Sequence, residues 1–211
     1  MKKSRLLIIS MIITLASTLG KAQTIKQVTI GNQIWMSENL NVSKFKNGDP
    51  IKEAKSKEDW VLASTNKEPA WCYVNNDSIT KYGKLYNLYA VIDPRGLAPQ
   101  GWHVCSLDEV NVLIANVGGI SKAGASLKSQ IIKGKDIYYN KYKFSGLLCG
   151  YRDAEWDFMK VSAEGKYWTS TTEIYSRKLY AQYFMLANYA EQIYIHSGND
   201  KDGLSVRCVK D

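Results

Sequence analysis

The segment GWHVCSLDEV, residues 101–110, holds the side chains of this chain that are best suited to chemistry. His103 stands two residues before Cys105, and a neighbouring imidazole is one of the groups that activate a catalytic thiol. The same residues could instead contribute to a metal site, or Cys105 could form a disulfide. Because the sequence offers His103 no cluster of partners, we expect it to be a packed residue of the buried stretch GWHV.

The N-terminal segment MKKSRLLIISMIITLASTLGKAQ has the layout of a cleavable export signal, with basic residues before an apolar run and small residues after it. The run, Leu6 to Leu19, is shorter than the about 20 residues that span a bilayer. We therefore predict a signal peptide over residues 1–23 and one exported domain over residues 24–211. We expect this domain to be periplasmic, on the cell surface or secreted, without a membrane span after cleavage.

Removal of the signal changes the charge of the chain. The segment carries four basic residues and no acid, so its loss lowers the formal net charge from +8 to +4. A charge this small is ordinary for a soluble domain. No basic stripe or arginine-rich arm is present, which argues against a nucleic-acid partner.

Four cysteines remain in the predicted mature chain: Cys72, Cys105, Cys149 and Cys208. An even number in an exported chain favours disulfides, with three connectivities open. The nearest two, Cys72 and Cys105, are 33 positions apart, and the chain has only two histidines. This spacing is not that of a zinc site.

The loop that contains Asn199, Asp200 and Asp202 is a candidate calcium site, because it places hard oxygen ligands before a glycine. It lacks the later glutamate of an EF-hand, and turns rich in Asn and Asp also form without metal. We therefore expect no cofactor, and calcium at these three residues is the alternative.

Two further groups are candidate ligand contacts. Arg152 and Asp153 in GYRD could bind a ligand, although a local ion pair that fixes the loop is the simpler interpretation. Trp60 lies in the polar segment 44–69 and Trp156 follows Ala-Glu, so we expect both indoles to be exposed and able to stack on sugars. Weaker aromatic candidates are Tyr175, Tyr180 and Tyr189.

The pattern of apolar residues predicts an α+β domain. One helix is expected in GKLYNLYAVI, residues 83–92, and a second begins at the capping box formed by Ser106 and Glu109. The segment 44–69 is expected to be a long surface loop with a short helix near Trp60. Strand-like runs are separated by turn signals. They cover residues 24–40 (a hairpin), 71–74, 144–148, 165–170, 179–186, 192–196 and 204–209, with an antiparallel meander at the end.

Seven segments carry a resemblance to a known family. In chain order they are IGNQIWMSENL, WCYVNND, KYGKLYNLYAV, LAPQGWHVCSLDEV, GYRD, YWTSTT and GLSVRCVKD. Together they resemble the Fibrobacter succinogenes major paralogous domain over nearly all of the predicted mature chain. The resemblance implies a fold like that of C-type lectins and formylglycine-generating enzymes. Such a fold has two helices packed on irregular antiparallel sheets, with the first and last strands close together.

The resemblance also bears on the cysteines. Cys105 and Cys149 stand where the family usually has other residues, and two unusual cysteines that occur together suggest that they pair. Cys72 and Cys208 stand where the family often has cysteine, so the resemblance pairs these two. Formylglycine-generating chemistry needs a reactive cysteine pair near the end of the domain, and only Cys208 lies there.

These observations predict a non-catalytic exported binding or interaction domain, with surface polysaccharide or a surface protein as its partner. A structural subunit of a cell-surface assembly is the alternative. An enzyme related to formylglycine-generating oxidases is a weaker third hypothesis. No feature of the sequence separates binding from assembly.

Overall fold

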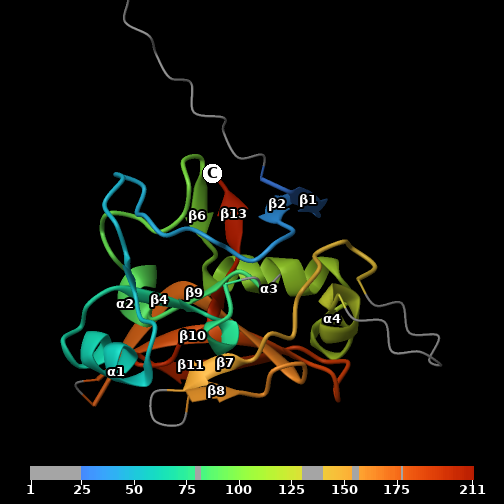
Figure 1. Cartoon of the computed structure of the whole chain (residues 1–211). Helices are drawn as coiled ribbons and strands as arrows, with labels where there is room; N and C mark the ends of the chain where they lie inside the picture. The colour runs from blue at the N-terminus through green and yellow to red at the C-terminus, as the bar shows by residue number, and fades with distance from the viewer. Residues whose placement is uncertain (1–24, 79–81, 130–139, 154–156, 177) are drawn as a thin grey trace, which may run out of the picture.

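Short apolar runs that alternate with turn residues form several small sheets, and helices pack among them (Figure 1). The computed structural model describes residues 25–78, 82–129, 140–153, 157–176 and 178–211. The mixed α+β class is confirmed. The predicted signal peptide, residues 1–23, lies outside the described residues. Within them, no helix has the length and apolar character to cross a membrane.

The first sheet joins the two ends of the described chain. Its strands are β1 (Gln27–Ile30), β2 (Gln33–Met36), β13 (Cys208–Lys210) and β6 (Trp102–Val104), in the order β1-β2-β13-β6. The predicted hairpin is present, and Gly31 takes the left-handed conformation that its turn requires, with φ 61°. Val209 pairs with Trp35 on one side and with His103 on the other. The first and last strands thus share one sheet, as the resemblance implies.

The second sheet is the largest. Its strands are β9 (Glu164–Tyr175), β10 (Lys178–Ala187), β11 (Tyr194–Asn199) and β12 (Ser205–Val206), in the order β11-β10-β9-β12. β10 pairs antiparallel with both β9 and β11, whereas β12 runs parallel to β9. The predicted final meander is therefore correct for β10 and β11 and wrong for the residues that follow.

Two smaller sheets complete the strands. One contains β3 (Lys52–Glu53), β4 (Ala70–Tyr73) and β5 (Lys84–Tyr86), and the other contains β7 (Tyr151–Asp153) and β8 (Asp157–Met159). Residues 144–148, predicted as a strand, make only an isolated bridge between Gly146 and Lys128. Phe144 and Leu148 are buried in the core. Their apolar side chains resemble the sequence pattern of a strand, although these residues form none.

Four α-helices are present in the described residues, where two helices and a short third helix near Trp60 were predicted. They are α1 (Lys57–Thr65), α2 (Leu88–Val91), α3 (Leu107–Asn116) and α4 (Ile120–Leu127), and a 3₁₀ turn covers Val74–Asn76. The short helix expected near Trp60 is α1. The capping box of Ser106 and Glu109 begins α3 as predicted, and a second box of Ser56 and Asp59 begins α1.

The helix predicted over residues 83–92 is largely wrong. Lys84–Tyr86 pairs with β4 as strand β5, and helix α2 begins only after Asn87. The side chain of Asn87 accepts from the main-chain N–H of Ala90 and of Ala70, so the same group caps the helix and anchors β4. Pairing with a distant strand overrides the local helical pattern here.

Helix α4 was missed because its sequence, ISKAGASL, consists mainly of small and polar residues. It has no side-chain cap, and it buries Ala123, Gly124, Ala125 and Leu127. A Cβ at Gly124 would overlap the main-chain carbonyls of Glu191 and Gln192. Small residues thus let this helix lie directly against the segment that leads into β11.

The core has three parts. Helices α3 and α4 cover one face of the second sheet, through a cluster that includes Leu113, Leu127, Tyr167 and Phe184 (Figure 1). A second cluster lies around β5, α2 and the loop after β2, and it buries Trp168 from the opposite face of the sheet. A third surrounds α1 and β4.

Candidate functional site

The GWHV stretch forms strand β6, whose side chains alternate between the core and the surface. Trp102 and Val104 are buried, but His103 points to the other side and its side chain is 43% exposed. The stretch GWHV is therefore buried at Trp102 and Val104 as expected, but the side chain of His103 itself is not.

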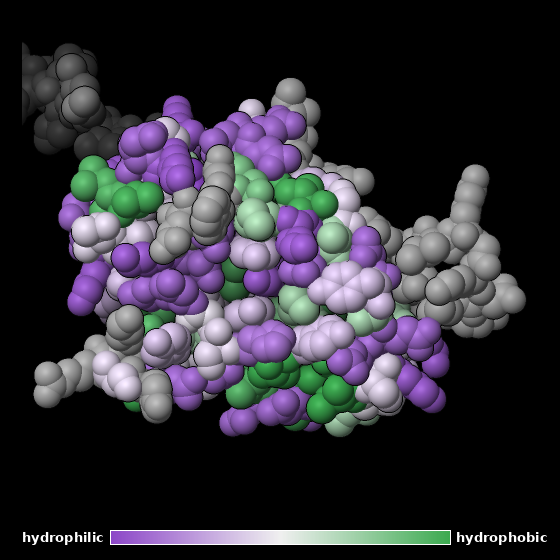
Figure 2. Space-filling view, turned by 90° about the horizontal axis from the view of Figure 1, so that it is seen from below, coloured by the Kyte–Doolittle hydropathy of each residue, from purple (hydrophilic) through white to green (hydrophobic). Residues whose placement is uncertain are grey.

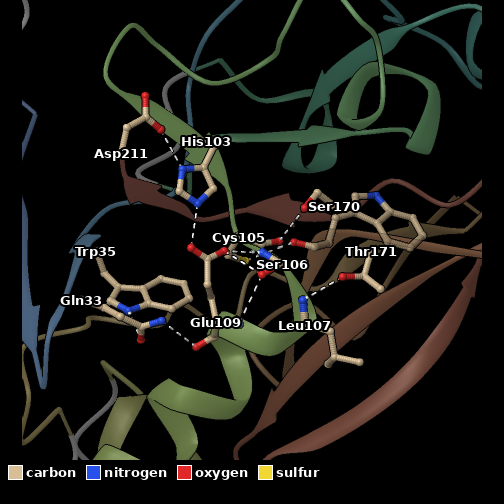
Figure 3. A network of polar contacts seen from close by, with 11 residues as sticks. Gln33, Trp35, His103, Cys105, Ser106, Leu107, Glu109, Ser170, Thr171 and Asp211 are labelled. Atoms are coloured by element: carbon tan, nitrogen blue, oxygen red, sulfur yellow. Dashed lines mark hydrogen bonds and ion pairs between the residues drawn. The ribbon is translucent and has the colours of Figure 1, made fainter.

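His103 lies between two carboxylates (Figure 3). Its Nε2 is 2.7 Å from Glu109 Oε1, and its Nδ1 is 2.7 Å from Asp211 Oδ1. Burial lowers the pKa of His103, but hydrogen bonds to Asp211 and Glu109 outweigh this effect and raise it. Both ring nitrogens are occupied, so His103 has no nitrogen left for a metal or for the proton of a substrate. It acts as a bridge from the chain end to α3.

The two carboxylate oxygens of Glu109 have different partners in this network. Its Oε2 accepts from the main-chain N–H and the hydroxyl of Ser106, each at 2.8 Å, while Oε1 faces His103. The main-chain oxygen of Glu109 also accepts from Gln33 of β2. Burial raises the pKa of Glu109, yet the hydrogen bonds to Ser106 and His103 lower it overall. The negative carboxylate at the helix start is stabilised further by the helix dipole.

Cys105, behind this network, is a core residue and no nucleophile. It is fully buried, and its thiol faces the main-chain oxygen of Trp168 at 3.8 Å. Burial, together with Cys208 and Glu109, raises the pKa of the thiol well above its ordinary value. A nucleophilic cysteine needs the opposite shift. The segment 101–110, whose residue types suggested a reactive site, therefore joins β6, α3 and β9.

Neither disulfide implied by the resemblance is formed in the part of the chain that the structure describes. Cys105, Cys149 and Cys208 are buried thiols. Cys105 and Cys149 lie in different core clusters, and so do Cys72 and Cys208, which explains why neither pair meets. Cys149 instead lies 3.1 Å from the hydroxyl of Ser205.

Trp60 is also a core residue, so its predicted role as an exposed sugar contact is wrong. Its side chain is 0% exposed, and Nε1 donates to the main-chain oxygen of Lys201 at 2.8 Å. The polar residues around Trp60 suggested exposure, but helix α1 turns this side chain inward. Trp156 lies outside the described residues.

Arg152 lies beneath the same indole. It is 1% exposed, its guanidinium stacks 5.0 Å from the ring of Trp60, and it donates to the main-chain oxygens of Ala54 and Ser56. Its own backbone pairs with Gly203. Arg152 thus fixes α1 against the loop after β11 and is closed to an external ligand, whereas Asp153 is half-buried next to it.

The acidic loop after β11 makes internal contacts. The side chain of Asn199 accepts from the main-chain N–H of Lys201, and the carboxylate of Asp200 accepts from the hydroxyl of Tyr89 at 2.5 Å. Asp202 is half-buried. No group of three or more His, Cys, Asp or Glu side chains among the described residues is arranged to hold a metal. Calcium at these residues stays a prediction.

The second sheet presents aromatic side chains that the sequence analysis did not single out. Tyr183 of β10 pairs with Trp168 of β9 and with His196 of β11, so the three side chains lie on one face. Tyr194 shares this face, and its ring stacks on that of His196 with centroids 6.0 Å apart and an angle of 12°. On the opposite face the neighbouring residues point into the core under α3 and α4.

We call the rings of Tyr183, Tyr194 and His196, together with that of Tyr151, the tyrosine platform. Tyr151 joins it from β7, because the ammonium of Lys166 lies 3.3 Å from its ring centroid and also faces Tyr183. The tyrosines are half-exposed and His196 is exposed.

The floor of the platform is held by close packing. Trp168 is fully buried and meets the ring of Tyr183 edge-on, with centroids 6.1 Å apart. Gly198 leaves room for this indole, since a Cβ at that position would lie 2.5 Å from its six-membered ring. Seen from the side where β7, β8, β10 and β11 lie, the surface is mainly hydrophilic, with its hydrophobic residues in separate patches (Figure 2).

Charged groups surround the platform. Burial, with the charges of Asp202 and Glu164, raises the pKa of Tyr183 to about 12, so its hydroxyl stays protonated. Burial lowers the pKa of Lys166, although Glu164 and Asp202 oppose this. Glu164 also accepts from the hydroxyl of Tyr189 at 2.8 Å. The platform therefore combines ring faces with neutral hydroxyls, carboxylate acceptors and one ammonium donor.

The signal for the platform was present in the sequence but incomplete. Alternate positions of the predicted strands, Tyr194 and His196 for example, carry aromatic rings. Which rings share a face depends on how β9, β10 and β11 pair. The sequence of a single strand does not determine that pairing.

Comparison with known families gives one result. The sequence profile of the Fibrobacter succinogenes major domain matches residues 28–210, which includes all of the helices and nearly all of the strands described above. The searches of curated proteins and of solved structures returned no match.

Proposed function

The chain belongs to the Fibrobacter succinogenes major domain family, and from this premise we propose that it is a non-catalytic binding domain whose tyrosine platform recognises polysaccharide. We also propose that it acts outside the cytoplasm, since residues 1–23 have the layout of an export signal. A C-type-lectin-like architecture is part of the same proposal.

One observation carries this proposal: the rings of Tyr183, Tyr194 and His196 reach solvent on one face of the second sheet, and Tyr151 of β7 lies beside them. A tyrosine ring offers an apolar face to the C–H groups of a sugar and a hydroxyl that donates and accepts hydrogen bonds. Tyrosine also loses little conformational entropy on binding, because it has two rotatable side-chain bonds. Strand backbones hold the rings in place before the ligand arrives, which reduces the cost of binding.

The charged neighbours suit the same ligand class. The half-buried Asp202 can accept hydrogen bonds from sugar hydroxyls, and the half-buried Lys166 can donate to them, whereas Glu164 is buried and positions Tyr189. Hydrogen bonds with a charged partner are stronger than neutral ones. The platform can thus bind a polyhydroxylated chain by both stacking and polar contacts.

The test is binding of the mature protein to a panel of soluble and insoluble polysaccharides, followed by substitution within the platform. We expect Tyr194→Ala to weaken binding at least about fivefold, the scale of roughly 1 kcal/mol for an interface residue that matters. Tyr194→Phe keeps the ring and should retain most of the affinity. Val112→Ala, at an exposed position of α3 on the other side of the sheet, is the control. If Tyr194→Ala and Val112→Ala bind alike, the platform is not the binding surface.

A subunit role in a surface assembly has one observation in its favour. Ile174, near the end of the β9–β10 hairpin, is 78% exposed, and burial of this apolar side chain against another protein would be favourable. Light scattering over a range of concentrations separates the two functions. Oligomers that Ile174→Ser abolishes, without polysaccharide binding, would favour assembly.

A further inference from the structure

A cleft with a volume of about 500 Å³ is lined in part by residues that flank β1 and β2. These two strands lie on the opposite side of the molecule from β7, β10 and β11, the strands that carry the tyrosine platform (Figure 1). Residues 36–42, which comprise the end of β2 and the segment after it, form one wall. Lys26, Gly83, Ser145 and Leu147 are among the residues that complete it. This volume falls within the range of about 300–1,000 Å³ that is typical of small-molecule sites.

A buried guanidinium lies directly behind the wall of this cleft. Arg207 is fully buried, and its Nε donates to Asn39 Oδ1 at 2.8 Å. Its Nη1 donates to the main-chain oxygen of Met36 at 2.9 Å, and its Nη2 to that of Ser145 at 2.7 Å. All three of these partners line the cleft. The charge is therefore separated from the cleft by a single layer of residues.

No carboxylate neutralises Arg207 within ion-pair distance among the described residues. Its hydrogen bonds go to carbonyl and amide oxygens, and its guanidinium stacks 4.5 Å from the ring of Phe144. A buried charge without an opposite charge is costly, because burial removes its hydration. The electric field of Arg207 is focused toward the cleft, because the cleft is the nearby opening of the low-dielectric protein to solvent. The cleft therefore has a positive potential.

A second cation strengthens this potential. Lys84 is only 5% exposed, and its Nζ lies 3.5 Å from the main-chain oxygen of Asn41, another residue of the cleft wall. At the rim, Lys26 pairs with Glu38 at 2.7 Å, so these two charges largely cancel. The pair is exposed to solvent, whereas Arg207 and Lys84 are shielded, and shielded charges are less screened by salt.

Hydrogen-bond donors are available on the same wall. Among the hydrogen bonds of the described residues, none uses the main-chain N–H of Asn39 or of Asn41. Anion sites in proteins commonly combine such main-chain N–H groups with a nearby positive charge. We propose that this cleft binds a small anionic ligand, whose carboxylate or phosphate group lies against residues 39–41. This site is additional to the tyrosine platform.

The experiment uses the mature chain at low ionic strength and titration calorimetry with three probes: sodium glucuronate, inorganic phosphate and glucose. We expect glucuronate or phosphate to bind and glucose not to, because glucose is similar in size to glucuronate but lacks the charge. Preference between the two anions identifies the carboxylate or the phosphate as the ligand chemistry. Absence of heat with both anions at millimolar concentrations, or equal binding of glucose and glucuronate, would overturn the proposal.

Substitution then locates the site. Arg207 is a core residue whose loss would disturb folding, so we use Asn41→Asp, which adds a negative charge to an exposed wall residue with little change in shape. We expect it to weaken anion binding at least about tenfold. Asn32→Asp, the same change in the turn at the far end of the β1–β2 hairpin, should leave binding unchanged. Tyr194→Ala should also leave it unchanged, which separates this test from that of the platform. Anion binding that Asn41→Asp does not weaken lies elsewhere and contradicts the proposal.

Discussion

The imidazole of His103 and the carboxylate of Glu109, whose Nε2 and Oε1 atoms are 2.7 Å apart, connect strand β6 to the first turn of helix α3. The same carboxylate closes the capping box of α3 through Ser106. Helix capping and histidine protonation are therefore linked through one residue, and this linkage gives the fold a dependence on pH.

We expect His103 to stabilise the fold below neutral pH and to lose this effect as the pH rises. Burial lowers its pKa, but the carboxylates of Asp211 and Glu109 raise it above 6.5 overall. A raised pKa adds stability that is complete below the unfolded-state value and disappears as the pH rises through the folded-state value. Because the side chain is 43% exposed, the contribution should be about 1 kcal/mol or less.

The measurement compares urea denaturation of the wild type and His103→Gln at about pH 5.5 and about pH 8.5, on either side of the usual range of histidine. The substitution should cost more free energy of unfolding at the lower pH. His196→Gln, at an exposed residue without an ion pair among the described residues, is the matched control. Equal losses for His103→Gln at both pH values would show that the bridge is not charged.

We expect Gly124→Ala to destabilise the protein although alanine is the better helix former. In an exposed helix this change stabilises by up to about 1 kcal/mol. In α4 the new Cβ would overlap the main-chain oxygens of Glu191 and Gln192, which cannot move without displacing the segment before β11. The net cost should be about 1–3 kcal/mol in the free energy of unfolding, measured by urea denaturation. Ser121→Ala, exposed in the same helix, should be neutral or slightly stabilising, and similar values for both variants would refute the close contact.

We expect three thiols to be inert in the folded protein. Cys105, Cys149 and Cys208 are fully buried, and burial raises the pKa of each thiol. Native protein treated with iodoacetamide should remain unlabelled at these positions, and protein unfolded in guanidinium chloride should be labelled at all three. Peptide mapping by mass spectrometry reads out both states. A disulfide-linked peptide in the digest of unreduced exported protein would contradict the thiol state described above.

Local signals in the sequence were reliable where the structure they specify is local. The capping box at Ser106 and the Gly31-Asn32 turn each involve residues three or fewer positions apart, and both are present. The helix expected over residues 83–92 failed because Lys84–Tyr86 finds its partner in β4, which no local pattern reveals.

The candidate sites depended on distant contacts, and the predictions for Trp60 and for the cysteine pairs were wrong. Trp60 stands in a polar segment, yet α1 turns it under the loop after β11, where Arg152 stacks on it. The cysteine count suggested bridges, but counting gives no distances, and the suggested partners lie in different parts of the core. The tyrosine platform and the guanidinium behind the cleft require the pairing of strands that are far apart in the sequence.

The position of β13 has a consequence for how the protein is made. This strand, Cys208–Lys210, lies in the middle of the first sheet, between β2 and β6. During synthesis the hairpin of β1 and β2 leaves the ribosome long before β13, so the first sheet cannot be completed until residues 208–210 have been added. Formation of this sheet therefore depends on its most C-terminal strand, whose Val209 pairs with both Trp35 and His103.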